Sequence, residues 1–140
     1  MTILDTNVIS ELMASSPALS VHAWISDRRF TGELHVTAIN VAEILYGIEL
    51  LPKGKRRDGL VSEAEAMFAE DFAGRILPFD EQSARMFAQI ATGRRSLGRP
   101  ITEFDAQIAS IARANGATLA TRNTSDFEGC GIQVVNPWVD

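Results

Sequence analysis

Asp5 is the first of four acidic residues in this sequence whose positions suit catalytic chemistry. It follows the apolar segment Met1–Leu4, which predicts a short buried strand that ends at Asp5. Ligands of open α/β sheets bind beyond the carboxyl ends of the strands, so a carboxylate at this position is well placed for chemistry. The alternative role is to cap the next helix, which for this segment taken alone is the more common use of Asp.

Glu43 is the second acid, and it lies on a predicted helix over residues 38–51. From residue 34 to residue 48 it is the only acidic or basic residue, His35 aside. A lone carboxylate on such a helix either solvates its exposed side or coordinates a ligand, and the segment favours the two roles about evenly. Glu43 lies off the apolar stripe of this helix, which consists of Val41, Ile44, Leu45 and Ile48.

Asp105 and Asp126 complete the set. Thr102 and Asp105 have the spacing of a capping box, which gives Asp105 a possible structural role. Asp105 also shares a helix face with Ile108 and Ala112, so we expect it to face inward at the start of its helix. Asp126 follows a predicted buried strand, as Asp5 does, and the alternative there is an ordinary turn rich in Asn, Ser and Asp.

Four carboxylates brought together by a fold would repel one another, and their pKa values would rise. A hard divalent cation removes this conflict, and an all-oxygen set of ligands selects Mg²⁺ or Mn²⁺ over zinc. Such a cation, with some water ligands retained, is suited to the hydrolysis of a phosphodiester. The residues that would orient the acids or the water are Thr6, Asn7, Thr121 and Asn123.

The composition fits a single domain over residues 1–140 with a sizeable core, since 46% of the residues are hydrophobic. No apolar run is long enough to cross a bilayer, and no secretory signal is visible. Cys130 is the only cysteine, which excludes an internal disulfide and fits a reducing cytoplasm, and two histidines are too few for an obvious zinc motif. The net charge of −5 argues against a broad nucleic-acid-binding surface, although acids that hold metal ions are neutralised by those ions.

Helical and strand patterns alternate along the chain, so we predict a mostly parallel sheet with helices on both faces, a three-layer α/β/α sandwich. The strands are expected near Ile3, Val36, Ile76, Thr118 and Val134. Beyond residues 38–51, helices are expected after Asp5, after Pro17, over residues 60–73, after the capping residue Asp80, and from Thr102 to about Ala114.

Two basic clusters stand out beside these elements. Residues 53–57 are expected in a loop, and Arg94, Arg95 and Arg99 form a second group. For residues 53–57, a solvated turn is the more common role. The alternative is a patch that contacts phosphates beside the crevice.

Taken together, four segments resemble the motifs of PIN-domain ribonucleases. The segment LDTNVISE at 4–11 resembles the first motif and NVAEILYG at 40–47 the second. RPITEFDAQIA at 99–109 resembles the third, and ATRNTSDFEG at 120–129 the fourth. All four occur in order over essentially the whole chain, and the likeness is to the VapC toxins of bacterial toxin–antitoxin pairs, including the FitB-like branch.

The resemblance implies a Mg²⁺- or Mn²⁺-dependent endoribonuclease that arrests growth by cutting a stable RNA. Asp5, Glu43, Asp105 and Asp126 would then form an acidic quartet that binds metal, with Asp5 and Asp105 the usual ligands and Asp126 the most variable. The resemblance also implies a homodimer, a basic groove for RNA, and a small antitoxin with a DNA-binding end whose tail blocks the site. Glu103 departs from the pattern, as an extra acid able to compete with Asp105.

Three other functions stay open on the sequence. A catalytically silent module of the same fold would bind RNA or a partner, but it would have no need to keep all four acids. A phospho-acceptor receiver domain pairs adjacent acids near its first strand and uses a late lysine, whereas no lysine follows Lys55 here. A flap-type DNA nuclease shares much of the site, and nothing in the sequence reads a 2′-hydroxyl, so RNA as the substrate follows from the resemblance alone.

Overall fold

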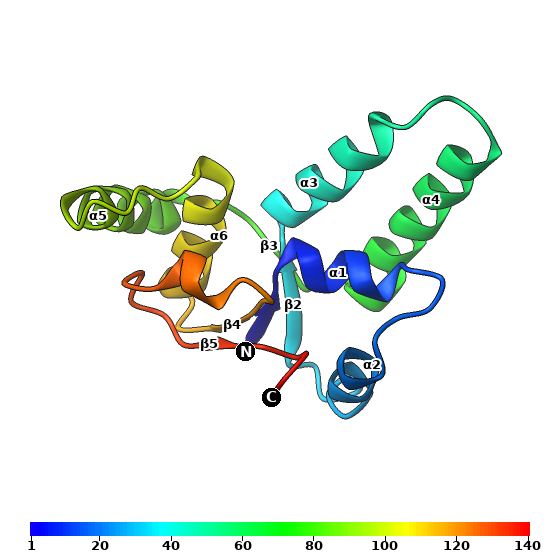
Figure 1. Cartoon of the computed structure of the whole chain (residues 1–140), viewed down its shortest axis with the longest axis horizontal. Helices are drawn as coiled ribbons and strands as arrows, with labels where there is room; N and C mark the ends of the chain where they lie inside the picture. Colours follow the sequence, from blue (N-terminus) through cyan, green and yellow to red (C-terminus); the bar gives the residue numbers. More distant parts are fainter.

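A five-stranded parallel sheet forms the centre of the protein, whose computed structural model describes all residues from 1 to 140 (Figure 1). The strand order is β3-β2-β1-β4-β5, and every neighbouring pair is parallel. The predicted α/β sandwich is confirmed, and so are all five predicted strands. These are β1 (Thr2–Leu4), β2 (Leu34–Thr37), β3 (Ile76–Leu77), β4 (Thr118–Ala120) and β5 (Val134–Val135).

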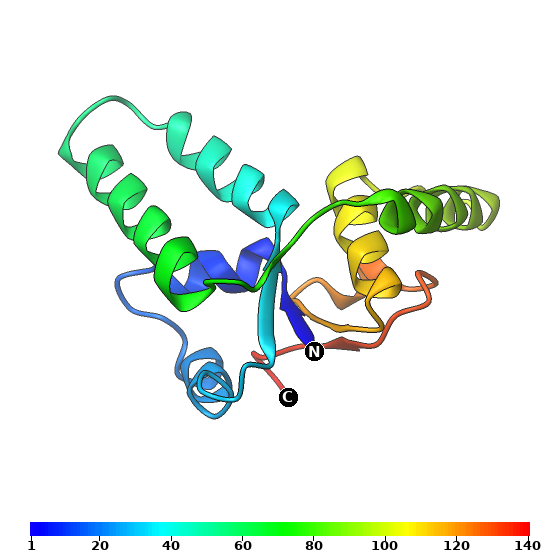
Figure 2. The same cartoon turned by 180° about the vertical axis from the view of Figure 1, so that it is seen from behind.

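Six α-helices cover the two faces of this sheet, with α1 to α4 on one side and α5 and α6 on the other (Figures 1 and 2). None of them is long and apolar enough to span a membrane. Their bounds are α1 (Thr6–Leu12), α2 (Leu19–Ser26), α3 (Ala38–Glu49), α4 (Lys55–Ala66), α5 (Glu81–Ser96) and α6 (Glu103–Ala114). Two shorter elements are the π-helical turn η1 (Met67–Asp71) and the 3₁₀ turn η2 (Thr124–Phe127).

The start of α4 differs from the prediction. The helix expected over residues 60–73 begins at Lys55, so residues 55–57 form its first turn and do not lie in a loop. The apolar pattern that marks a helix starts only at Leu60, and it missed the polar first turn. Arg57 forms an ion pair with Glu49 at the end of α3, which favours a helical start at this point.

Two hydrophobic cores lie on opposite faces of the sheet because successive strand residues point to opposite sides. Leu4 of β1 packs with α1 to α4, whereas the preceding Ile3 packs with α5 and α6. The strands at the centre therefore read as continuous apolar runs, and the sheet is buried on both faces.

Side-chain caps fix where the helices begin. Thr37 ends β2 and caps α3 directly, since its hydroxyl accepts a hydrogen bond from the backbone N–H of Asn40 (3.1 Å). The predicted caps are confirmed: Asp80 accepts from the N–H of Ser83 and Thr102 accepts from the N–H of Asp105. The strand-to-helix junction at Thr37 places the first turns of α3 at the carboxyl edge of the sheet.

We predict that Leu119→Ala in β4 costs about 2–5 kcal/mol of the free energy of unfolding. The side chain of Leu119 is fully buried between neighbouring strands and α6, so its loss leaves a cavity. The matched control is Leu19→Ala at the exposed start of α2, for which we expect a change within about 0.5 kcal/mol. Urea unfolding measures both, and equal losses in the two variants would contradict the assigned core.

Candidate acidic site at the carboxyl edge of the sheet

The strand order reverses at β1, because the chain first extends the sheet through β2 and β3 and then continues on the other side with β4 and β5. Ligand sites of open α/β sheets lie at such a switch point, beyond the carboxyl ends of the two strands. Asp5 is the first residue after β1, and Thr121 is the first after β4. The Thr121 hydroxyl donates to Oδ2 of Asp5 over 2.7 Å, so the two strand ends meet at this carboxylate.

Asp5 is 5% exposed and accepts hydrogen bonds only from neutral groups. Besides Thr121, the backbone N–H of Thr6 donates to Oδ1 (2.8 Å) and Nδ2 of Asn7 donates to Oδ2 (3.3 Å). Burial raises the pKa of Asp5, the hydrogen bonds oppose that rise, and the charges of Asp105 and Asp126 add to it. Asp5 thus caps α1, as its alternative role required, and also lies close enough to Asp105 and Asp126 for their charges to act on it.

Glu43 is tied to the same region through the side chain of Thr6. The Thr6 hydroxyl donates to Oε1 of Glu43 (2.8 Å) and in turn accepts a hydrogen bond from Nδ2 of Asn40 (3.0 Å). Burial raises the pKa of Glu43, the bond from Thr6 opposes it, and the charges of Asp5 and Asp105 raise it further. The side chain therefore faces the other acids and is not a purely solvating group.

Asn40 is a residue of this site that the sequence analysis did not single out. It is fully buried, and its Oδ1 accepts from both the backbone N–H and the hydroxyl of Thr37 (2.8 Å each). Its other end donates to Thr6, so Asn40 links the cap of α3 to the hydroxyl that holds Glu43. The signal was present in the sequence, because Asn40 follows Thr37 at capping-box spacing.

Asp105 and Asp126 lie on the other side of the switch point. Asp105 is half-buried in the first turn of α6, and burial raises its pKa. The charge of Asp126 raises the pKa further, whereas the hydrogen bond with Thr102 and the charge of Arg94 lower it. Asp126 is exposed in η2. Glu103 is exposed, as expected for a residue pointing away from Asp105.

The structure thus brings together four acids from four separate segments. The pKa of each of Asp5, Glu43 and Asp105 is raised by the negative charge of at least one other member of the quartet. No three His, Cys, Asp or Glu side chains are arranged, however, so that together they could hold a metal ion. This edge of the sheet therefore carries several acids near one another, and Arg94 is the cation whose charge opposes the raised pKa of Asp105.

The four polar neighbours predicted to orient the acids lie at the site in different ways. Thr6 and Thr121 donate directly to carboxylates, and Asn7 bridges Asp5 and the Thr121 hydroxyl (3.1 Å). Asn123 makes its contact through the backbone, since its N–H donates to the Thr121 hydroxyl (3.1 Å).

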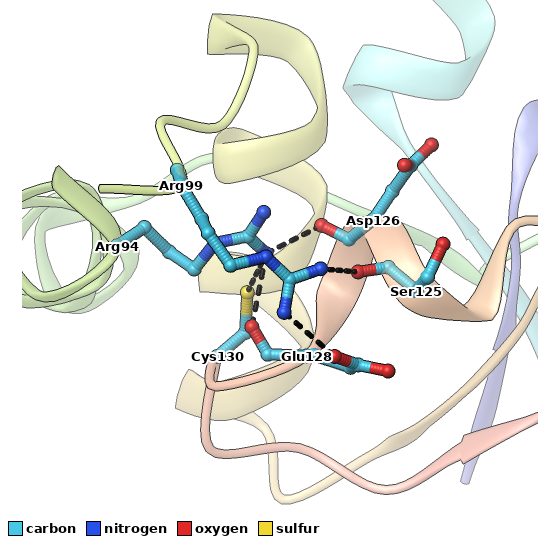
Figure 3. Close-up of polar contacts among 6 residues, drawn as sticks. All are labelled: Arg94, Arg99, Ser125, Asp126, Glu128 and Cys130. Atoms are coloured by element: carbon cyan, nitrogen blue, oxygen red, sulfur yellow. Dashed lines mark hydrogen bonds and ion pairs between the residues drawn. The ribbon is translucent and has the colours of Figure 1, made fainter. Parts of the chain in front are cut away.

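Arg94 does not belong to a solvated or phosphate-contacting basic cluster, contrary to its grouping with Arg95 and Arg99. It is 4% exposed and donates to the backbone carbonyl oxygens of Asp126 (2.6 Å) and Glu128 (2.9 Å) (Figure 3). The physical reason is helical periodicity, which places Arg94 on the inward face of α5, one turn after the buried Ile90.

This fold and site define a family. The chain belongs to the PIN domain family, whose model matches residues 2–129, and this confirms the resemblance drawn from the four motifs. It is 41% identical over 138 residues to the VapC ribonuclease Y4jK of Sinorhizobium fredii, covering 99% of this chain and 98% of the relative. It is also 41% identical over 140 residues to the toxin FitB of Neisseria gonorrhoeae, with both chains fully covered. A solved structure of FitAB bound to an IR36 DNA fragment matches with a TM-score of 0.90 and 40% identity, covering 99% of this chain and 96% of that one.

We predict that Glu43→Gln stabilises the folded protein at about pH 7 when EDTA removes divalent metal. The raised pKa of Glu43 means that its folded carboxyl binds a proton more tightly than the unfolded one, so stability is lost as the pH rises through those pKa values. The amide avoids this loss and keeps an oxygen for the Thr6 hydroxyl. Urea unfolding should show a gain at about pH 7 that shrinks towards about pH 4, where the wild-type carboxyl becomes protonated.

The matched control for this measurement is Glu65→Gln on the exposed surface of α4. We expect no comparable pH-dependent gain from that substitution. A Glu43→Gln protein that is less stable than wild type at about pH 7 would show that the carboxylate is compensated in the fold, against our description of the site.

Proposed function

We propose that this protein is a Mg²⁺- or Mn²⁺-dependent endoribonuclease, the toxin of a toxin–antitoxin pair. The observation that carries the proposal is the group of acids at the carboxyl edge of the sheet, where buried Asp5 lies near three further acids and is held by neutral hydrogen-bond donors. Full-length similarity to proteins named VapC ribonuclease and toxin FitB supports the same conclusion. Capping alone would explain Asp5, but it does not explain why Asp105 and Asp126 lie close enough for their charges to raise its pKa.

The chemistry of the site residues fits Mg²⁺ or Mn²⁺. The side chains of the acidic quartet offer only carboxylate oxygens. The groups that donate hydrogen bonds to these oxygens are hydroxyls, a side-chain amide and a backbone N–H. Hard divalent cations prefer such oxygen ligands, whereas zinc prefers sulfur and imidazole. Asp5, Glu43, Asp105 and Asp126 are the candidate ligands, and because no three of them are arranged to hold an ion in this structure, their side chains would have to move closer together to bind one. The bound cation would supply an activated water and offset charge on the phosphate.

The chain's own residues prepare this site by fixing the orientation of its acids. Three donors hold the two oxygens of Asp5, so its carboxylate cannot rotate freely. The relay from Asn40 through Thr6 holds Oε1 of Glu43 and leaves its other oxygen available. Without bound cations the same acids repel a phosphate backbone, so we expect RNA binding in the crevice to depend on metal.

We also propose a small antitoxin as the partner, with a DNA-binding end, and a homodimeric toxin. The similarity to a FitAB complex bound to DNA supports a partner of this kind. A tail of the antitoxin would have to meet the negative crevice with positive charge, because uncompensated acids attract cationic side chains.

We predict that purified, antitoxin-free protein cuts total bacterial RNA into discrete fragments when Mg²⁺ or Mn²⁺ is present and not in EDTA. Asp5→Asn should reduce cleavage to the level of the EDTA control while the far-ultraviolet circular dichroism is unchanged, because the amide keeps the shape and removes the charge. The matched control is Asp27→Asn at the exposed end of α2, which should cleave like wild type.

The outcomes separate the alternatives. Equal cleavage by wild type and Asp5→Asn would refute the assigned site. Metal binding without cleavage of any RNA would favour a silent binding module of the same fold, and cleavage of single-stranded DNA in preference to RNA would favour a DNA nuclease.

A further inference from the structure

The guanidinium of Arg94 joins three segments of the chain, one of which carries Asp126 (Figure 3). Its Nε donates to the carbonyl oxygen of Arg99 (2.8 Å), in the connection that leads from α5 to α6. Its Nη1 donates to the carbonyl oxygens of Asp126 (2.6 Å) and Glu128 (2.9 Å). One side chain from α5 therefore ties the lead into the helix that carries Asp105 to the segment that carries Asp126.

This role suits arginine for a specific physical reason. Its planar fork can serve several carbonyl oxygens at fixed angles, and hydrogen bonds from a charged donor are stronger than neutral ones. Lysine has a single nitrogen and cannot reproduce the fork. Arg94 forms no ion pair with any carboxylate, and its hydrogen-bond partners are backbone carbonyls and the sulfur of Cys130 (3.8 Å).

The Asp126 segment, residues 124–130, has little regular structure with which to hold itself in place. Its only helical part is the four-residue turn η2, and 3₁₀ turns of this length have poor hydrogen-bond geometry. Arg99 also contacts the segment, through Glu128 (2.7 Å) and the carbonyl oxygen of Ser125 (3.2 Å), but these groups are exposed and contribute less. The buried contacts are those of Arg94 and of the core residues Phe127 and Cys130.

We infer that Arg94 is a positioning residue of the acidic site, which holds the Asp126 carboxylate in place relative to Asp105 through the backbone of residues 126–128. The role of Arg94 in catalysis rests on the proposed function. Its role in positioning residues 126–128 does not. Arg94 lies too deep behind the segment to contact a substrate, and its action passes through the Asp126 backbone.

The test compares the full-length variants Arg94→Gln and Arg94→Lys with a matched control, Arg95→Gln. Arg95 is the next residue of α5, is exposed and forms no hydrogen bond through its side chain. Three quantities are measured for each protein: urea stability, amide hydrogen exchange by mass spectrometry, and Mn²⁺ affinity by electron paramagnetic resonance.

We expect Arg94→Gln to remain folded at low temperature and to speed amide exchange in residues 123–130 by about tenfold, with little change in the strands. Its Mn²⁺ dissociation constant should rise by about tenfold, a loss typical of removing a group that orients a metal ligand. Arg94→Lys should lie between wild type and Arg94→Gln, and Arg95→Gln should match wild type.

Wild-type exchange and Mn²⁺ affinity in a folded Arg94→Gln protein would overturn the inference. If Arg94→Gln does not fold, Arg94→Lys decides, and a lysine variant with wild-type exchange and affinity overturns it as well. If neither variant folds, Arg94 serves global stability and the inference fails. A wild-type protein that binds no Mn²⁺ would refute the proposed function, while the exchange data would still decide whether Arg94 positions the segment.

Discussion

The crowding of like-charged carboxylates at one edge of the sheet is the constraint on which the rest of this structure depends. Asp5 is almost completely buried, every group that donates to it is neutral, and Asp105 and Asp126 add negative charge nearby. Burial and repulsion both disfavour an ionised carboxylate, so the folded chain keeps this arrangement at a cost in stability. A divalent cation would offset that cost, which is why we propose metal-dependent chemistry at the site and not capping alone.

Neutral hydrogen-bond donors surround these acids, and the buried guanidinium of Arg94 contacts the backbone next to one of them. Thr121 and Asn7 fix Asp5 where β1 and β4 end, while Asn40 and Thr6 fix Glu43 at the start of α3. On the other side Arg94 holds the backbone near Asp126. Neutral donors next to the carboxylates leave their charge available for a ligand, whereas the cationic side chain is directed at backbone carbonyls.

Much of this arrangement could be predicted from local sequence patterns. The strand that ends at Asp5 and the caps at Asp80 and Thr102 depend on adjacent residues, and all three were predicted. Arg94 was misassigned because an arginine is ordinarily solvated, and its burial depends on carbonyl groups more than 30 residues away. The start of α4 at Lys55 depends in the same way on a tertiary partner, Glu49, which no local apolar pattern reveals.

We propose that acids on four segments assemble a metal site, and anomalous diffraction from crystals soaked in MnCl₂ tests this proposal most directly. The account predicts a manganese peak bound by Asp5 and at least one other member of the acidic quartet, and no such peak in Asp5→Asn crystals. The contradicting result is a wild-type crystal, soaked above neutral pH, that shows no manganese at these carboxylates or shows manganese only elsewhere.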